Sequence, residues 1–354
     1  MTPRILRALR TKESEATRTR DVHRRRESQA TVQTCYGLGT HMRTRLLGET
    51  GIAATELGLG TWGLSGDGYG PVAEAEQDRV IERALALGIR LFETADSYAH
   101  GGMEERLGRL LPREPSVAVV TKLGTCRESV PPRKRFDAEY LERALERSLG
   151  RLRRDKIDVV LLHSPSLEAV QRGAAIDFLV RAACDGRIGA WGVAAGTEEV
   201  GRAALERGAQ VLSIAHNAFH PMELEALRPQ LEERSVGILA HSVLAYGLLC
   251  GLWSPDKLFP EGDHRAERWT RDDLRLRIRQ LDALRPVVRG PVATMRSGAL
   301  RYVLNEELVS CVLLGPRSTL QLDQLVREAG KGPPYLSPDQ LTALYARLHE
   351  VLAN

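Results

Sequence analysis

The stretch VAVVTKLGTCRESVPPRKRFDAEYLERALERSLGRLRRDKIDVVLLH, residues 117–163, contains the unit on which the fold depends. Two of its segments, residues 117–122 and 158–163, are rich in Val and Leu and are typical of buried strands. Between them, residues 137–153 place apolar side chains on one face of a helix. These side chains are Leu141, Ala144, Leu145, Leu149 and Leu152. A strand, a helix and a second strand in this order predict two parallel strands joined by a helical crossover.

The same alternation extends in both directions from residue 42 onward. The predicted strands are residues 56–60, 90–94, 117–122, 158–163, 189–193, 211–216, 236–241 and 311–314. The predicted helices are residues 74–87, 104–111, 138–153, 174–185, 198–207, 224–233, 297–305 and 320–329. Eight strand–helix units predict an α/β fold, a closed (β/α)₈ TIM barrel that forms a single domain over residues 42–354.

Three segments lie outside the eight units. Residues 44–47 and 52–54 predict an N-terminal β-hairpin, and residues 337–352 predict a C-terminal helix. Residues 250–290 predict an enlarged loop with one helix after the seventh strand. Loops that follow barrel strands lie over the catalytic face, so this enlarged loop is a candidate lid.

The alternative fold is a doubly wound sheet that binds a dinucleotide. Gly58, Gly60 and Gly63 match the fingerprint G-x-G-x-x-G. The fingerprint requires a helix directly after the glycines, whereas the next residues are LSGDGYGP. The barrel is therefore the preferred prediction.

The net charge of +4 comes from the first 41 residues. They hold nine Lys and Arg against four Asp and Glu, a balance of +5, which leaves −1 for the other 313 residues. Residues 42–354 thus have no excess of positive charge for binding nucleic acid. The basic leader, residues 1–41, lacks the apolar stretch of a secretory signal and has little hydrophobic pattern, so we expect it to be disordered.

Hydrophobicity and cysteine usage narrow the class of protein further. No run of about 18 apolar residues is present, which argues against a membrane span. Five cysteines are scattered without C-x-x-C spacing. This pattern argues against a disulfide framework and favours a reducing, cytoplasmic location. The sequence indicates neither the oligomeric state nor the identity of a substrate.

Four polar residues follow successive predicted strands at the end where catalytic groups of such barrels lie. They are Glu93, Tyr98, Lys122 and His163. A phenol is a poor acid at neutral pH, but a neighbouring ammonium favours the phenolate and lowers the phenol pKa. Glu93 can hold that ammonium in place, and His163 can hydrogen-bond a substrate oxygen. Singly, each residue also fits a surface charge or a satisfied core group, but together the ordered set could protonate a carbonyl oxygen as hydride arrives.

The motifs around these residues resemble the aldo-keto reductase family. They are Glu56-Leu-Gly-Leu-Gly-Thr-Trp-Gly63, Phe92-Glu-Thr-Ala-Asp-Ser-Tyr98, Thr121-Lys122-Leu, the strand that ends at His163, and Gly186-Arg-Ile-Gly-Ala-Trp-Gly-Val193. The resemblance implies an NADP(H)-dependent oxidoreductase that reduces an aldehyde, ketone or keto-sugar carbonyl by hydride transfer. It also implies that Tyr98 is the general acid, that Lys122 tunes it and that His163 orients the carbonyl.

The resemblance further implies a cofactor groove and a substrate pocket. Residues implied to bind NADP(H) are Gly60, Thr61, His216, Ser242, Leu244, Gly247, Gly315, Arg317, Ser318, Gln321 and Gln324. Arg317 would make charge-assisted bonds to the 2′-phosphate and favour NADPH over NADH. Trp62 is implied at the edge of the substrate pocket.

The nicotinamide end departs from the family pattern. Glu93 replaces an aspartate, Ala194 and Ala195 replace Ser-Asn, Ser213 replaces a Gln, and His216 stands for the tyrosine that stacks on the nicotinamide. Alanine side chains form no hydrogen bonds. Two explanations remain open. Other groups, such as His216 and Trp62, hold the nicotinamide, or the barrel performs non-redox acid–base chemistry as a lyase, isomerase or cyclase.

Two further alternatives also remain open. The chain is a regulatory subunit that senses NADP(H) without turnover, or His163, His216 and His241 converge with Glu93 on a divalent ion. Strand ends on one barrel face bring such groups together by chance, so we predict no metal site.

Overall fold

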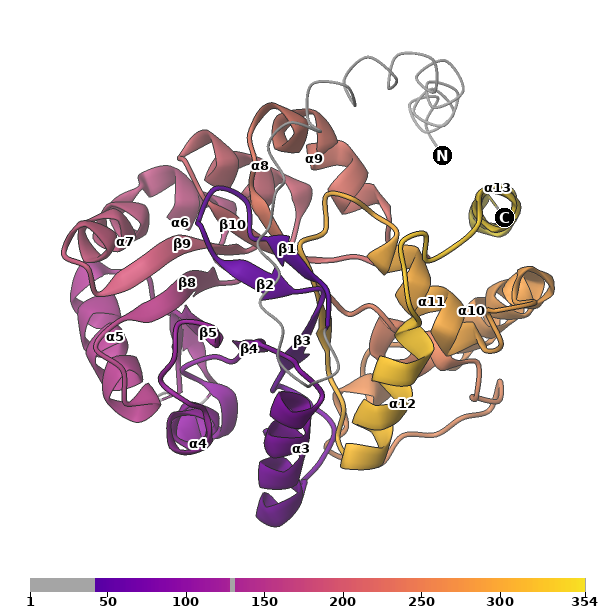
Figure 1. Ribbon diagram of the computed structural model, residues 1–354, viewed down its shortest axis with the longest axis horizontal. Helices are drawn as coiled ribbons and strands as arrows, with labels where there is room; N and C mark the ends of the chain where they lie inside the picture. The colour runs from indigo at the N-terminus through magenta and orange to yellow at the C-terminus, as the bar shows by residue number, and fades with distance from the viewer. Residues whose placement is uncertain (1–41, 128–130, 354) are drawn as a thin grey trace. The chain divides into compact units, whose positions relative to one another are not determined.

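The computed structural model describes residues 42–127 and 131–353. Eight parallel strands form a closed barrel with the neighbour order β10-β11-β12-β3-β4-β5-β8-β9. Figure 1 labels the barrel strands from β3 to β10. The strands are β3 (Leu57–Gly60), β4 (Leu91–Glu93), β5 (Ala118–Leu123), β8 (Ile157–His163), β9 (Ile188–Ala194), β10 (Val211–Ala215), β11 (Gly237–His241) and β12 (Cys311–Leu314). The ring closes where Val211 of β10 pairs with Gly192 of β9. The predicted (β/α)₈ barrel is confirmed, and the doubly wound alternative is wrong.

Helices surround the barrel and connect its strands (Figure 1). They are α3 (Glu74–Ala86), α4 (Gly102–Leu110), α5 (Ala138–Leu152), α6 (Leu167–Arg172), α7 (Ala174–Cys184), α8 (Glu198–Glu206), α9 (Met222–Glu233), α11 (Met295–Leu304) and α12 (Thr319–Ala329). Several begin at a side-chain cap, which satisfies amide groups that have no partner within the helix. Asp137 caps α5 and Ser318 caps α12 in this way.

The apolar side chains form two cores that follow the alternation of each strand. Side chains that point inward fill the barrel, for example Leu91, Val159 and Leu239. Their sequence neighbours point outward and pack against the helices, for example Phe92 and Val160. Successive side chains of a strand face opposite sides, so each strand contributes to both cores.

A β-hairpin closes the amino-terminal end of the barrel. Its strands are β1 (Thr44–Leu46) and β2 (Ala53–Thr55), which pair antiparallel and lie in front of the barrel in Figure 1. Leu47 and Ala54 of this segment are fully buried and belong to the core inside the barrel. A side chain at Gly237 would collide with Leu47, so the hairpin is packed closely against the start of β11. A ligand can therefore enter the barrel only from the opposite end, where the strands have their carboxyl ends.

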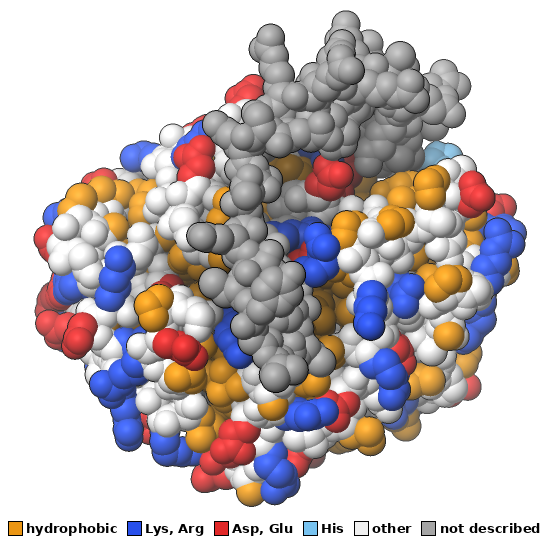
Figure 2. All heavy atoms as spheres, viewed as in Figure 1, with side chains coloured by type: hydrophobic (Ala, Val, Ile, Leu, Met, Phe, Trp, Pro, Cys, Tyr) orange, Lys and Arg blue, Asp and Glu red, His pale blue; other side chains and the backbone are white. Residues whose placement is uncertain are grey.

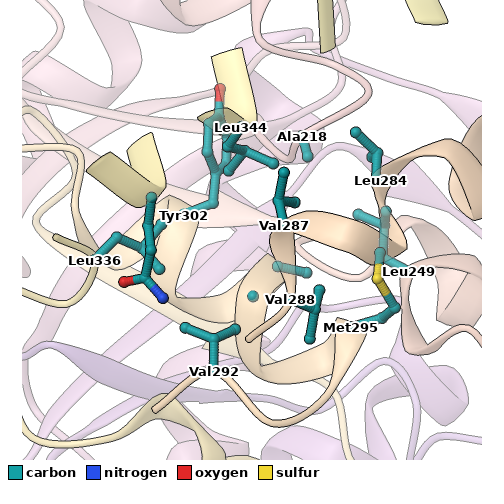
Figure 3. Close-up of a pocket in the computed structure, with 13 residues that line it drawn as sticks. Ala218, Leu249, Leu284, Val287, Val288, Val292, Met295, Tyr302, Leu336 and Leu344 are labelled. Atoms are coloured by element: carbon teal, nitrogen blue, oxygen red, sulfur yellow. The ribbon is translucent and has the colours of Figure 1, made fainter. Parts of the chain in front are cut away.

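The predicted enlarged loop and C-terminal helix are both present. The loop contains η2 (Ala245–Cys250), η3 (His264–Ala266), the helix α10 (Arg271–Leu284) and η4 (Arg285–Val287). The C-terminal helix α13 (Pro338–Ala353) contacts α10, because Gln280 Nε2 donates to the main-chain oxygen of Val351 at 2.9 Å. Between them a cavity of about 30 Å³ is lined almost wholly by apolar side chains, such as those of Leu249 and Leu344 (Figure 3). This space holds about one water and offers few polar partners, so we assign it no ligand.

Some short elements are absent from the sequence predictions. Among them are α6 and the two strands of a small hairpin, β6 (Thr125–Cys126) and β7 (Arg133–Lys134). A two-residue strand is too short to show alternation, and the six residues of α6 make fewer than two helical turns, so pattern counting does not detect them. The small hairpin follows β5 and forms part of the site described below.

The surface seen in Figure 2 mixes acidic and basic side chains. The described helices include none that is both long and apolar enough to cross a bilayer. The predicted disordered leader, residues 1–41, lies outside the described residues, so the prediction for it stays a prediction.

Candidate active site

A cavity of about 820 Å³ opens at the carboxyl ends of the barrel strands. This volume lies within the range of roughly 300–1,000 Å³ that is typical of small-molecule sites. Residues from the ends of seven strands line it. They are Gly60, Glu93, Lys122, His163, Ala194, His241 and Leu314. The barrel thus brings the polar residues predicted at the strand ends to one place.

Lys122 is at the centre of the predicted catalytic group. Its Nζ donates to Tyr98 Oη at 3.0 Å and to the main-chain oxygen of Thr94 at 2.8 Å. It also forms an ion pair with Glu93, and both side chains are buried. Three acceptors match the three N–H bonds of an ammonium, which fixes the position of the lysine. Glu93 therefore reaches Lys122, as predicted, despite its additional methylene.

Gly60 gives the Glu93 carboxylate its space. A Cβ at residue 60 would lie 3.3 Å from Glu93 Oε2, closer than an ordinary van der Waals contact. A larger residue here would push the carboxylate away from Lys122, so the glycine supports the ion pair.

The pKa of Tyr98 differs from the sequence-based expectation. Burial raises it to about 12, although the Lys122 ammonium acts in the predicted direction and lowers it. The desolvation of a phenolate costs more than one ammonium returns, and the charge of that ammonium is already offset by Glu93. Burial alone would lower the pKa of Lys122, but Glu93 and Tyr98 outweigh it and the pKa is raised. The pair therefore holds its protons at neutral pH, with a phenol that can donate one.

His163 faces Tyr98 with the two rings perpendicular and their centroids 5.9 Å apart. Burial, together with the positive charges of Lys122 and Lys134, holds the pKa of His163 well below its usual range. A neutral imidazole has one N–H donor and one acceptor. Its Nδ1 is buried and has no hydrogen-bond partner among the described residues. His163 can thus orient an oxygen in the cavity without adding a charge.

Most residues predicted to bind a cofactor also line the cavity. They are Gly60, Ser242, Leu244, Gly247, Gly315, Arg317, Gln321 and Gln324, with Trp62 at the substrate side. Arg317 donates through Nη2 to the main-chain oxygens of Gly70 and Pro71, at 2.9 and 3.1 Å. Its buried Nε has no partner among the described residues. The two main-chain contacts therefore hold the guanidinium in place at the wall of the cavity.

Three predicted cofactor residues do not reach the cavity. Thr61 and His216 are buried outside it, and His216 stacks on Tyr302 of α11 with ring centroids 5.6 Å apart. Ser318 caps α12, where its Oγ accepts from the Gln321 amide. The structure corrects the place expected for His216, which lies against α11 and outside the cavity. Alternate side chains of β10 point out of the barrel, and His216, one residue beyond Ala215, continues this outward series. Thr61 continues the outward series of β3 in the same way.

A different histidine lines the cavity near the strand ends. It is His241, the last residue of β11. Its Nδ1 lies 3.0 Å from Ser242 Oγ, and burial together with Lys122 lowers its pKa to about 4. Ser213 and Ala194 line the same region, and Ser213 Oγ is buried with no partner in the described part of the chain. The alternation along β11, with Leu239 inside the barrel, predicts His241 inside as well.

The enlarged loop, predicted as a candidate lid, contributes Trp253, Arg265 and Arg268 to the lining of the cavity. Asp263 pairs with Tyr69 in an isolated bridge, and the His264 amide donates to the Gly68 main-chain oxygen at 2.8 Å. The imidazole of His264 packs 4.8 Å from the Trp62 ring and 4.7 Å from the Tyr69 ring. The loop is therefore attached to the segment between β3 and α3, which also lines the cavity through Trp62 and Tyr69.

Within the described ranges, no group of three or more His, Cys, Asp or Glu side chains is arranged to hold a metal ion. The convergence of His163, His216, His241 and Glu93 considered from the sequence is not observed. The four cysteines in the described residues are free.

Comparisons with known proteins identify the family of the chain. The aldo/keto reductase family model matches residues 56–335. A pyridoxal 4-dehydrogenase of Microbacterium luteolum is 27% identical over 322 residues, covering 80% of this chain and 91% of that protein. An L-galactose dehydrogenase of Arabidopsis thaliana is 27% identical over 299 residues, covering 81% of this chain and 88% of that protein.

Solved structures give the same result for the fold. The glycerol dehydrogenase of Gluconobacter oxydans has a TM-score of 0.74 at 25% identity and covers 88% of this chain and 96% of its own. An aldo-keto reductase of Bacillus halodurans has a TM-score of 0.73 at 23% identity and covers 87% and 96%. The family match extends over well more than half of the sequence, so the chain belongs to the aldo/keto reductase family.

Proposed function

We propose that the protein is an NADP(H)-dependent oxidoreductase that reduces an aldehyde, ketone or keto-sugar carbonyl. The observation that carries the proposal is the Tyr98–Lys122–Glu93 contact at the wall of a cavity that extends to Arg317. Family membership supports carbonyl reduction as the class of reaction. A carbonyl compound of low molecular weight is thus the partner that the site fits, and four free cysteines support a reducing, cytoplasmic location.

Tyr98 is the proton donor in this proposal. Its oxygen accepts from Lys122 at 3.0 Å, which leaves its own O–H available to a carbonyl oxygen in the cavity. When bound, the reduced nicotinamide supplies the hydride. As negative charge develops on the carbonyl oxygen, the proton moves from Tyr98 Oη to that oxygen. The resulting phenolate lies beside the Lys122 ammonium, which stabilises it.

His163 and Glu93 position the reacting groups. A neutral His163 donates one N–H to the carbonyl oxygen without competing for the proton, because its pKa is held low. Glu93 keeps the Lys122 ammonium against Tyr98. These contacts exist before substrate binds, which lowers the cost of organising the site during the reaction.

The residues at the far end of the cavity fit NADP(H). Arg317 and Arg268 line this end of the cavity, and neither forms an ion pair with another described residue. Both could bind phosphate oxygens, and Ser242 and Gln321 offer polar side chains in the same region. At the end of the cavity proposed for the nicotinamide, Ser213 and His241 line the wall together with Ala194. Their side chains can form hydrogen bonds to the ligand, which the alanine side chain cannot.

The first test is titration of the purified protein with NADPH, followed by its fluorescence and then by oxidation of NADPH with a panel of carbonyl compounds. Binding followed by substrate-dependent oxidation is the expected result. Binding without oxidation across aldehydes, ketones and keto-sugars would favour the NADP(H)-sensing alternative. No binding at all would contradict the proposal and favour the non-redox alternative suggested by Ala194 and Ala195.

Arg317→Gln is expected to weaken NADPH binding by about 10- to 100-fold, because a charge-assisted bond to the 2′-phosphate is lost. NADH lacks that phosphate, so its Kd should change little. Arg317→Lys keeps the charge and should retain part of the preference. The measurement is the ratio of the two Kd values by fluorescence. An equal loss for NADPH and NADH would show that Arg317 only holds the turn through Gly70 and Pro71.

A further inference from the structure

The charges that line the cavity are unevenly paired. Seven Lys and Arg side chains line it within the described residues, against the two carboxylates of Asp67 and Glu93. Four of the seven form ion pairs: Lys122 with Glu93, Arg127 with Asp67, Arg265 with Asp263 and Arg296 with Glu328. In the part of the chain that the structure describes, Lys134, Arg268 and Arg317 form none. The cavity therefore has three cations to offer to a ligand.

Two of the three cations lie at the end proposed for the cofactor. Arg317 follows β12, and the guanidinium of Arg268 lies 3.8 Å from the centroid of the Tyr246 ring in the loop after β11. Dinucleotide phosphates account for both. Lys134 lies at the opposite end, next to His163, where the proposed carbonyl chemistry takes place. The phosphates of a dinucleotide therefore do not explain the positive charge of Lys134.

The position of Lys134 is fixed by the small hairpin. Lys134 and Thr125 are paired across β6 and β7, and Lys134 Nζ donates to Thr125 Oγ1 at 2.8 Å. Nζ also donates to the main-chain oxygen of His163 at 2.7 Å. An ammonium has three N–H bonds, so one remains for a ligand. The lysine is thus held against the catalytic histidine with one donor unused.

The surroundings of Lys134 favour an anion. The side chain is exposed, yet burial of its ammonium lowers its pKa to about 8, with Lys122 acting in the same direction and Asp96 opposed. A bound anion would offset this loss of solvation. Thr125 and Ser164 also line the cavity here. Since Thr125 Oγ1 accepts from Lys134, its hydrogen can be donated to a second oxygen of the same ligand.

We propose that Lys134, Thr125 and Ser164 form a subsite for a carboxylate, so that the substrate is an aldehyde or ketone that also carries a carboxylate group. The proposal rests on the carbonyl reduction proposed above and adds the substrate class. A single ammonium matches the single charge of a carboxylate. A phosphate dianion would need a second cation, and the neighbouring Arg127 is occupied by Asp67 and by the Ser97 main-chain oxygen.

The experiment compares two substrates that differ in one charge. 4-Carboxybenzaldehyde and its methyl ester have the same aldehyde and ring, so their kcat/KM ratio isolates the contribution of the carboxylate. The wild-type protein is expected to prefer the acid. Lys134→Met keeps the apolar stem and removes the charge, and it should lower the acid-to-ester ratio about 10- to 100-fold, mainly through KM. Lys134→Arg keeps the charge and should retain most of the preference.

The matched control is Lys156→Met. Lys156 is an exposed lysine directly before β8, at the opposite end of the barrel. The same substitution there should leave the acid-to-ester ratio unchanged and control for a general change in net charge. A wild-type ratio near one, or a ratio that Lys134→Met and Lys156→Met change equally, would overturn the proposal.

Failure of the proposed function is distinguishable from failure of the subsite. If the wild-type protein reduces neither aldehyde, calorimetry can still measure binding of 4-carboxybenzaldehyde to the wild type and to Lys134→Met. Weaker binding to Lys134→Met would support the subsite although the reaction proposal had failed. Equal binding to both proteins would contradict the subsite.

Discussion

Tyr98→Phe is expected to lower the rate of carbonyl reduction by about 10²- to 10⁴-fold, the range that a positioned general acid contributes. The substitution removes one oxygen atom. The ring can keep its perpendicular contact with His163 and its place 4.6 Å from the Lys122 ammonium. The loss should therefore be seen in kcat with little change in the Kd for NADPH. Single-turnover and steady-state rates of NADPH oxidation are the measurement.

Tyr335→Phe is the matched control for this variant. It removes a buried phenol that donates to Glu56 near the start of β3, at the opposite end of the barrel. Both variants lose one hydrogen bond between a phenol and a charged group, and each should lose about 1.5–3 kcal/mol of unfolding free energy. Only Tyr98→Phe should lose activity. Carbonyl reduction retained within about tenfold in Tyr98→Phe would refute the assignment of Tyr98 as the acid.

The barrel itself could be predicted because its strands are short buried runs separated by amphipathic helices. β12 was predicted with its observed bounds, and β8 and β9 were predicted within one residue of theirs. Burial on both faces makes such runs visible as continuous Val, Leu and Ile. The β6–β7 hairpin was missed because two-residue strands, one of them the charged pair Arg133–Lys134, show no such run.

The sequence indicates which side chains line the cavity where residue type and strand alternation agree. Glu93 and His163 each end a strand on its inward alternation, and both line the cavity. The resemblance implies His216 at the nicotinamide, whereas alternation from Ser213 inside the cavity points it outward. The same alternation along β11 points His241 inward, into the cavity. At this position the alternation of the strand determines which side chain reaches the cavity, and the motif does not.

The charge balance of the site could not be predicted from the sequence. Whether the pKa of Tyr98 rises or falls depends on the depth of burial against the distance to Lys122 and Glu93, and residue order contains neither. The role proposed for Lys134 has the same origin. Its sequence surroundings, PPRKRF, indicate only a charged loop, and the folded hairpin is what brings this lysine to His163.

Lys122→Met is expected to abolish measurable carbonyl reduction and also to destabilise the fold. The substitution leaves the Glu93 carboxylate buried without its cation, and breaking one side of a buried ion pair costs about 3–5 kcal/mol. Urea unfolding measures this loss as a lower midpoint with an unchanged slope. Low activity alone would then be ambiguous, because an unfolded fraction also fails to turn over.

The double variant Lys122→Met, Glu93→Leu separates the two effects. Replacing both members of a buried pair by apolar residues of similar size is often neutral or stabilising, so most of the lost unfolding free energy should return. Activity should not return, because the phenolate of Tyr98 would still form without an ammonium beside it. Recovery of stability without recovery of kcat assigns Lys122 a chemical role distinct from its contribution to folding. Recovery of both would show that the lysine only balances Glu93, and the proton transfer through Tyr98 would then need another source of electrostatic stabilisation.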